Sequence, residues 1–330
     1  LATKKYKLSV SKNGFETKTI SINPRPKIPQ AVSIQLITTE EAYWASRPEV
    51  ISTPLGNKLK LFKPNDEVFS MGAPRREPGR RANEAEKRIQ LQRPFYFAIT
   101  ETSNKEYRQW KSEHNSSSIR GLSLDLNDQP VSNIAWQDAA LFCNWLSEKE
   151  NLPKFYNVVG DRVTSINWDS NGYRLPTESE WSWVAKVTKA GSTKVFPWNS
   201  PSYPPPFVSG NYADESAKSM LPFTISNYND SFPVSASVGS FRPNEKGIFN
   251  LSGNVAEWVN DFYEIRVNKS EPLVDYRGPN TGNRHVIRGA SWALGSRSEL
   301  RLSYREPGNN GKIDVGFRIA RYVDKPKGDL

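Results

Sequence analysis

The side chains that carry out nucleophilic, redox and soft-metal chemistry are scarce in this chain. Its 330 residues include one cysteine, Cys143, and two histidines, His114 and His285. A single thiol excludes an intrachain disulfide. Cys143 falls on the apolar stripe of a predicted helix, where a thiol packs as a small hydrophobic group and stays unreactive. We interpret both histidines as surface or hydrogen-bonded core residues, because an iron site also needs a convergence of ligands that their spacing does not show.

The most informative motifs are short phrases that combine glycine, aromatic and polar residues in a fixed order. They are FSMG at residues 69–72, NGYRLPTESEWSW at 171–183, SGNVAEW at 252–258, RGASW at 288–292 and GFRIA at 316–320. In this order, they resemble the formylglycine-generating enzyme family, whose members are also called sulfatase-modifying-factor domains. The resemblance covers residues 55–324. It implies an α+β fold that is irregular and loop-rich, with a C-type-lectin-like core.

The resemblance also implies where the family's catalytic residues would stand. Its cysteine-dependent members hold copper with two thiols five residues apart, and the matching positions here are Leu294 and Glu299. Leu294 has no ligand atom, and Glu299 offers a hard oxygen where Cu(I) prefers soft thiolates. Ser291 matches the active-site serine but lacks a neighbouring thiol, base or metal to activate it. We therefore expect no copper and no catalytic residue at this degenerate site, and no formylglycine-generating activity.

The family's structural calcium (Ca²⁺) sites are better preserved than its catalytic site. Calcium takes ~6–8 oxygen ligands, which flexible loops can supply. By resemblance, the first site would use Asn211, Tyr212, Asp230 and Phe232. The second would use the backbone carbonyls of Ser252, Gly253 and Val255 and the carboxylate of Glu257. The alternative for both is a set of turns whose polar groups hydrogen-bond locally.

The elements that would position these residues can be read from periodicity and capping signals. Strands are expected near residues 59–62, 69–72 and 94–100, with Thr102 or Ser103 capping a helix after the last. Residues 134–150 predict an amphipathic helix, because Ala139, Phe142, Cys143 and Leu146 recur at helical spacing. Thr177 followed by Glu180 predicts a capping box at the start of another helix.

Residues 1–38 predict a separate, small β module. Tyr6, Leu8 and Val10 alternate with polar residues, Asn13-Gly14 signals a turn, and strands are expected at 17–22 and 31–36. The phrase at residues 8–15 resembles the PEGA domain, a β module that is usually extracytoplasmic, of which this would be a part. The alternative is an unrelated three-stranded sheet. Residues 39–54 are expected to be a linker with a short helix capped by Thr39, and 325–330 a tail.

The net charge and composition limit the kinds of partner that the chain is expected to bind. The net charge of +10 and pI of about 9.5 favour anionic partners, or simply describe a basic surface with no specific partner. Seven basic residues between positions 75 and 93 indicate a solvated loop or an anion-binding segment, and without interleaved aromatics they do not predict nucleic-acid binding. No stretch approaches the ~20 apolar residues that span a bilayer. Membrane association would therefore require an upstream segment before Leu1.

These observations lead to one functional expectation and one alternative. We expect a non-catalytic binding or scaffold component of an extracytoplasmic assembly in a bacterial cell envelope. Its partners would be proteins, with a polysaccharide as the second option, and the β module would tether it. The alternative is a cysteine-independent, metal-dependent oxidase of the same superfamily that uses Glu299, His285 or another metal site.

Overall fold

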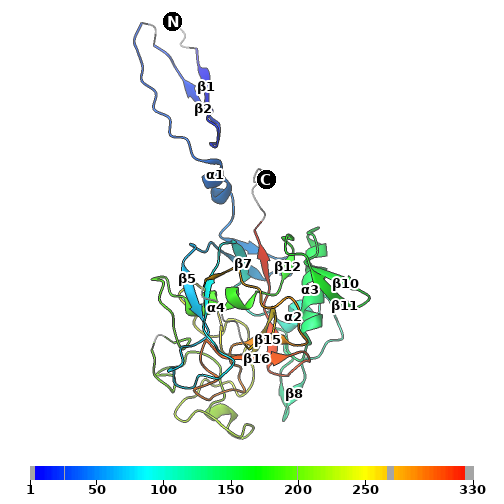
Figure 1. Ribbon diagram of the computed structural model, residues 1–330. Coiled ribbons are helices and arrows are strands. Elements are labelled where there is room, and N and C mark those ends of the chain that lie inside the picture. The colour runs from blue at the N-terminus through cyan, green and yellow to red at the C-terminus, as the bar shows by residue number, and fades with distance from the viewer. Residues whose placement is uncertain (1–3, 26, 199, 266–270, 324–330) are drawn as a thin grey trace. The chain divides into compact units, whose positions relative to one another are not determined.

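The computed structural model describes residues 4–25, 27–198, 200–265 and 271–323, which belong to two compact units. The larger unit spans Val50–Val323 (Figure 1). It begins before the boundary expected at residue 55, because strand β3 (Val50–Ser52) pairs with β4 (Lys58–Phe62). The expected tail at 325–330 lies outside the described residues. In the described parts, no helix has both the length and the apolar character needed to cross a membrane.

The N-terminal unit is a hairpin followed by a short helix. β1 (Tyr6–Val10) and β2 (Lys18–Ile22) pair antiparallel as expected, and α1 spans Thr39–Ala45. The strand expected at 31–36 does not form, because this segment makes no strand ladder with the hairpin. The helix cap is Thr38 rather than Thr39, since Thr38 forms the capping box with Glu41. None of the described residues from 4 to 49 is buried, and a hairpin without a core has little stability of its own.

The large unit contains three sheets and two small hairpins in its described residues. The first sheet has the order β12 (Tyr173–Arg174), β18 (Ala320–Tyr322), β7 (Phe95–Ala98), β4, β3. The second has the order β16 (Arg305–Gly308), β15 (His285–Arg288), β13 (Ala256–Phe262), β17 (Val315–Phe317), with β13 and β17 parallel. The third has the order β14 (Leu273–Val274), β6 (Lys87–Gln90), β5 (Val68–Met71). The hairpins are β8 (Ser118–Ile119) with β9 (Leu122–Ser123) and β10 (Tyr156–Val159) with β11 (Arg162–Ile166).

Three helices and a 3₁₀ turn connect these sheets in the described part of the unit. They are α2 (Asn104–Tyr107), α3 (Trp136–Lys149), α4 (Glu178–Lys186) and η1 (Glu215–Ala217). The four predicted stripe residues of α3 are all buried, and α3 lies beside β12 and the β10–β11 hairpin (Figure 1). Ser103 caps α2, and Thr177 caps α4 with Glu180 in the predicted capping box. The result is a mixed fold of sheets and short helices.

The core combines aromatic rings with buried arginine–glutamate pairs. Arg174, Arg301 and Arg318 are fully buried, and each forms an ion pair with a buried glutamate at 2.6 Å. Because an unpaired charge is costly to bury, these pairs fix which segments can meet. Arg318 on the loop after β17 pairs with Glu257 on β13, which ties the GFRIA phrase to the SGNVAEW phrase.

Candidate functional site

Ser291 is buried just after β15 and contacts one acidic residue. Its Oγ donates to Asp314 Oδ2 at 2.7 Å. Burial raises the pKa of Asp314, and the hydrogen bond from Ser291 opposes that rise. The expectation that Ser291 has no adjacent base is therefore wrong, because a carboxylate lies against its hydroxyl. Sequence reasoning missed Asp314 because it lies in a segment without a recognisable catalytic motif.

Leu294 and Glu299, which stand at the expected thiol positions, both take part in local structure. Leu294 packs against a buried cluster made of Phe196, Trp198, Tyr212, Ile225, Tyr228, Ala290 and Leu300. Glu299 Oε2 accepts hydrogen bonds from the Ser296 backbone N–H at 2.9 Å and from Ser296 Oγ at 2.7 Å. Its Oε1 lies 3.6 Å from a guanidinium nitrogen of Arg81. Glu299 thus closes a turn and forms a partly exposed ion pair.

The residues of the first implied calcium site lie together. Asp230 accepts hydrogen bonds from the backbone N–H groups of Tyr212 at 2.9 Å and Phe232 at 2.8 Å. The backbone N–H of Asp230 donates to Asp214, so two buried carboxylates stand close together. Burial, with Asp214 as a further cause, raises the pKa of Asp230 to about 7. The buried Oδ1 of Asn211 has no hydrogen-bond partner.

This first set is chemically suited to a calcium ion. Within the part of the chain that the structure describes, neither Asp214 nor Asp230 forms an ion pair. These two carboxylates and the unpaired amide oxygen of Asn211 are hard oxygen donors whose burial a divalent cation would compensate. Asp214 was not among the predicted residues; it caps the 3₁₀ turn η1, a role that gives no metal signal in the sequence. Among the described residues, no group of three or more His, Cys, Asp or Glu side chains could hold a metal, so backbone carbonyls would have to complete the shell.

The second implied calcium set is less suited to a metal. Glu257 Oε1 lies 2.6 Å from Arg318 Nη2, and its Oε2 accepts from Arg318 Nε and Trp181 Nε1, both at 2.8 Å. The Ser252 carbonyl accepts from the Tyr212 hydroxyl at 2.9 Å. The carboxylate of Glu257, which is the predicted ligand, is thus already paired with a buried guanidinium. Gly253 lies in the same turn, and the Val255 side chain packs in a small apolar cluster.

A second buried carboxylate next to this turn escaped the sequence analysis. Glu101 accepts hydrogen bonds from the side-chain amides of Asn250 at 2.9 Å and Asn254 at 3.1 Å. Burial raises its pKa to about 7, although Arg318 opposes the rise. These hydrogen bonds link Glu101 to residues that lie 149 and 153 positions later in the chain, so they hold the SGNVAEW turn against the segment after β7.

The histidines and the cysteine do not form a reactive cluster. His285 is stacked between Trp136 and Phe262, and burial lowers its pKa to about 4. His114 Nε2 lies 3.0 Å from the Ser132 carbonyl. Cys143 is fully buried, and burial raises the pKa of its thiol. Cys143 and His285 are therefore core residues, and His114 is half-buried and hydrogen-bonded, which agrees with the interpretation of the histidines as surface or hydrogen-bonded core residues.

The basic segment between residues 75 and 93 is largely used within the fold. Arg80 donates to the Ala73 carbonyl at 2.9 Å, and Arg93 to the Trp168 carbonyl at 2.5 Å. Arg81 lies over the Tyr304 ring and near two glutamates, and Lys87 is buried in β6 over Tyr276. This segment therefore does not present its full charge to an anion, because several of its cations have partners inside the protein.

Sequence reasoning also missed a cavity of about 760 Å³ that lies away from Ser291. Its lining comes from α3, β11, the end of β13, the start of β15 and a loop near residue 280. Segments so far apart in the chain carry no common motif, and only the folded structure brings them together.

Comparison with known proteins places the large unit in a family. Residues 46–323 match the sequence model of the sulfatase-modifying factor enzyme 1-like domain. The formylglycine-generating enzyme of Streptomyces coelicolor is 28% identical over 207 residues, which cover 61% of this chain and 55% of that protein. The chaperone protein LppX of Paenibacillus barcinonensis is 28% identical over 250 residues, which cover 69% of this chain and 80% of that protein. The inactive C-alpha-formylglycine-generating enzyme 2 of Mus musculus is 26% identical over 289 residues, which cover 77% of this chain and 83% of that protein.

A solved structure supports the same fold. Treponema denticola variable protein 1 superimposes with a TM-score of 0.65 at 23% identity, covering 84% of this chain and all of that one. At this identity, the likeness concerns the fold, and function has to be argued from the site.

Proposed function

Because the chain belongs to the family of sulfatase-modifying factor enzyme 1-like domains, we propose that it is a non-catalytic member that binds protein partners. The assembly would be extracytoplasmic and associated with a bacterial cell envelope. The observation that carries this proposal is the environment of Leu294 and Glu299, which pack and close a turn where the family resemblance implies copper-binding thiols.

Two relatives support a non-catalytic role by their names. One is described as inactive and another as a chaperone, and this chain covers 83% and 80% of their lengths. The matched region spans only 55% of the Streptomyces enzyme, so the activity of that protein is not transferred to this chain. Binding through loops is supported by exposed apolar side chains in the long segment between α4 and β13, where Phe207 and Phe223 are each 53% exposed.

We also assign a structural calcium ion to the first loop set. Asp230, Asp214 and Asn211 would supply side-chain oxygens, and nearby carbonyls would complete the shell. The ion would hold the loop around residue 212 against the loop around residue 230 and so stabilise a binding surface built from loops.

The decisive experiment offers the protein copper and a sulfatase-type cysteine peptide and measures the mass of the peptide. The expected result is no mass change, because neither Leu294 nor Glu299 is a thiolate. Conversion of the peptide cysteine to formylglycine would refute the proposal. A Leu294→Cys/Glu299→Cys variant restores the two sulfur ligands, and we expect it to bind Cu(I) where the parent protein does not.

The alternative, a cysteine-independent oxidase, is tested by metal analysis of the protein purified without added metal. Stoichiometric iron or copper would favour the oxidase, whereas calcium alone would favour the binding role. Partners and compartment are tested by cell fractionation and by pull-down with mass spectrometry, in which envelope proteins should be recovered.

A further inference from the structure

The large cavity lies at the opposite end of the β13–β15 pair from Ser291. In this pair, Phe262 faces His285 and Glu257 faces Arg288. Phe262 and His285 line the cavity at one end of this strand pair, whereas Ser291 follows Arg288 at the other end. Its volume of about 760 Å³ is within the range of small-molecule sites. It is therefore separate from the degenerate site, and an argument about it does not rest on the non-catalytic function proposed above.

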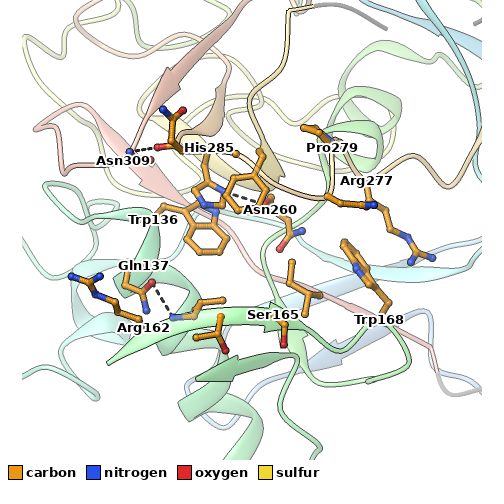
Figure 2. A pocket seen from close by; sticks show the side chains of 18 residues that line it. Trp136, Gln137, Arg162, Ser165, Trp168, Asn260, Arg277, Pro279, His285 and Asn309 are labelled. Atoms are coloured by element: carbon orange, nitrogen blue, oxygen red, sulfur yellow. Dashed lines mark hydrogen bonds between the residues drawn. The ribbon is translucent and has the colours of Figure 1, made fainter. Parts of the chain in front are cut away.

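The floor of the cavity is a stack of flat rings. The imidazole of His285 lies parallel to Trp136, with ring centroids 3.5 Å apart and an interplanar angle of 7° (Figure 2). Phe262 covers the other side of His285 at 4.4 Å. The Nδ1 atom of His285 lies 3.2 Å from the Asn260 carbonyl, which holds the ring in place. This stack closes the base of the cavity, and because Trp136 and His285 are buried, the partly exposed ring of Phe262 is the part of the stack that a ligand could contact.

The walls carry positive charge without a matching acid. The guanidinium of Arg277 lies 4.4 Å from the centroid of the Trp168 ring, and Arg162 stands on β11 across the cavity (Figure 2). Neither arginine forms an ion pair within the described residues, and no described lining residue is an aspartate or glutamate. A guanidinium fork can bind a carboxylate or phosphate group through two hydrogen bonds, and a second arginine on the opposite wall adds to the positive potential of the cavity.

The start of α3 adds to this positive potential. Its first two residues, Trp136 and Gln137, line the cavity, and the N-cap residue Ala135 makes no side-chain capping bond. The carboxylate in the first turn, Asp138, pairs instead with Lys111 at 2.6 Å. The N-terminal end of a long helix carries a partial positive charge that favours an anion nearby.

Much of the remaining lining is made of neutral hydrogen-bonding groups, beside the apolar side chains of Val163, Ile166 and Pro279. Asn280, Asn283 and Asn309 come from two loops, and Thr164 and Ser165 from β11. Amides and hydroxyls both donate and accept, so they match a ligand that presents many hydroxyl groups better than they match an apolar one. Aromatic rings that can pack against a sugar, a guanidinium group that can bind an anion and amides that can bind hydroxyl groups thus line the same cavity.

We propose that this cavity binds an acidic saccharide, that is, a sugar ring that carries a carboxylate or a phosphate. Arg277 holds the anionic group, the partly exposed rings of Phe262 and Trp168 contact the apolar face of the sugar, and the asparagines bind its hydroxyls. Arg162, on the opposite wall, adds to the positive potential of the cavity (Figure 2). Arg277 is the central residue, because Trp168 fixes the plane of its guanidinium.

Isothermal titration calorimetry on the full chain tests this site with four probes: digalacturonate, glucose 6-phosphate, maltose and inorganic phosphate. At least one acidic sugar should bind at least about tenfold more tightly than maltose and inorganic phosphate, and which one binds identifies the anionic group. Arg277→Ala should weaken that binding by roughly 10- to 100-fold, since it removes charge-assisted hydrogen bonds. The affinity of Arg277→Lys should lie between those of the parent protein and Arg277→Ala, because lysine keeps the positive charge but lacks the two-pronged guanidinium group.

A matched control is Arg297→Ala, which removes another arginine that lies over an aromatic ring, Tyr203, at 5.4 Å. Its affinity should equal that of the parent protein. Arg162→Ala is a second test at an exposed hairpin position that does not threaten folding. Equal affinity for maltose, tight binding of inorganic phosphate alone, binding unchanged in both arginine variants, or no binding of any acidic sugar would overturn the proposal.

Discussion

The buried pair of Glu257 and Arg318 gives the sharpest test of how this fold is held together. Glu257 is 1% exposed and Arg318 is fully buried, and the guanidinium contacts both carboxylate oxygens. The substitution Glu257→Gln keeps the shape of the side chain and an acceptor for Trp181. It removes the negative charge that pairs directly with Arg318, so that the buried cation keeps only its electrostatic interaction with the nearby carboxylate of Glu101 among the described acidic residues that act on it.

The magnitude follows from what Arg318 retains. Its nitrogens also donate to the carbonyls of Ala98, Ile99 and Phe249 at 2.9–3.3 Å, so the cation does not lose every partner. Breaking a buried pair costs about 3–5 kcal/mol, and these carbonyls place the expected loss near the lower end, at about 3 kcal/mol. For a unit of this size, the melting temperature should fall by roughly 6–12 °C.

Denaturant unfolding and differential scanning calorimetry measure this loss. The control is Glu148→Gln, because Glu148 pairs with Lys154 in an exposed ion pair that should contribute less than about 1 kcal/mol. The double variant Glu257→Gln/Arg318→Met should recover part of the loss, since it removes the stranded cation. If Glu257→Gln lowers the free energy of unfolding no more than Glu148→Gln does, the buried pair is not what holds the SGNVAEW and GFRIA segments together.

Three further predictions concern the loops and the cysteine. Calcium should raise the melting temperature of the parent protein and should raise that of Asp230→Asn much less. An equal rise in both proteins would show that the ion binds elsewhere. In EDTA, stability should fall as pH rises from about 6.5 to 8, because burial raises the pKa values of Asp230 and of Asp261 on β13 to about 7 and about 8 in the folded state, against about 4 when unfolded. A flat profile over that range, measured by denaturant midpoint, would contradict this. Below about pH 6.5, the lowered pKa of His285 opposes this fall in stability. Cys143 should resist a thiol reagent in the native protein and react once the protein is unfolded, whereas fast native labelling would show that α3 opens readily.

Helices α3 and α4 could be predicted from sequence because their signals are local, whereas the cap of α1 is one residue earlier than predicted. The stripe on α3 and the Thr177–Glu180 capping box depend on spacings of three and four residues, and both are confirmed. The strand expected at 31–36 is wrong, because alternation marks a strand only where a neighbouring strand and a core exist to receive it. The small unit offers no buried position to those residues.

The candidate sites were harder to predict because they depend on contacts between distant segments. Nothing near Asp314 in the sequence indicates that it meets Ser291, and Asp214 reads as a turn residue rather than as a neighbour of Asp230. Glu257 matched a ligand position by motif, yet its charge is satisfied by Arg318, which lies 61 residues away. A motif gives the residue type, whereas the partner decides whether that residue is available.

The buried arginine–glutamate pairs constrain how this core can change over evolutionary time. A substitution of either partner alone strands a charge in the interior, so most single changes at these positions pass through a poorly folded intermediate. Such positions should vary together across homologues, with both members kept or both replaced by apolar residues of similar volume. Exposed loop positions without buried charges, such as Phe207 and Phe223, face no such coupling, so the surface can diversify while the charged framework beneath it stays fixed.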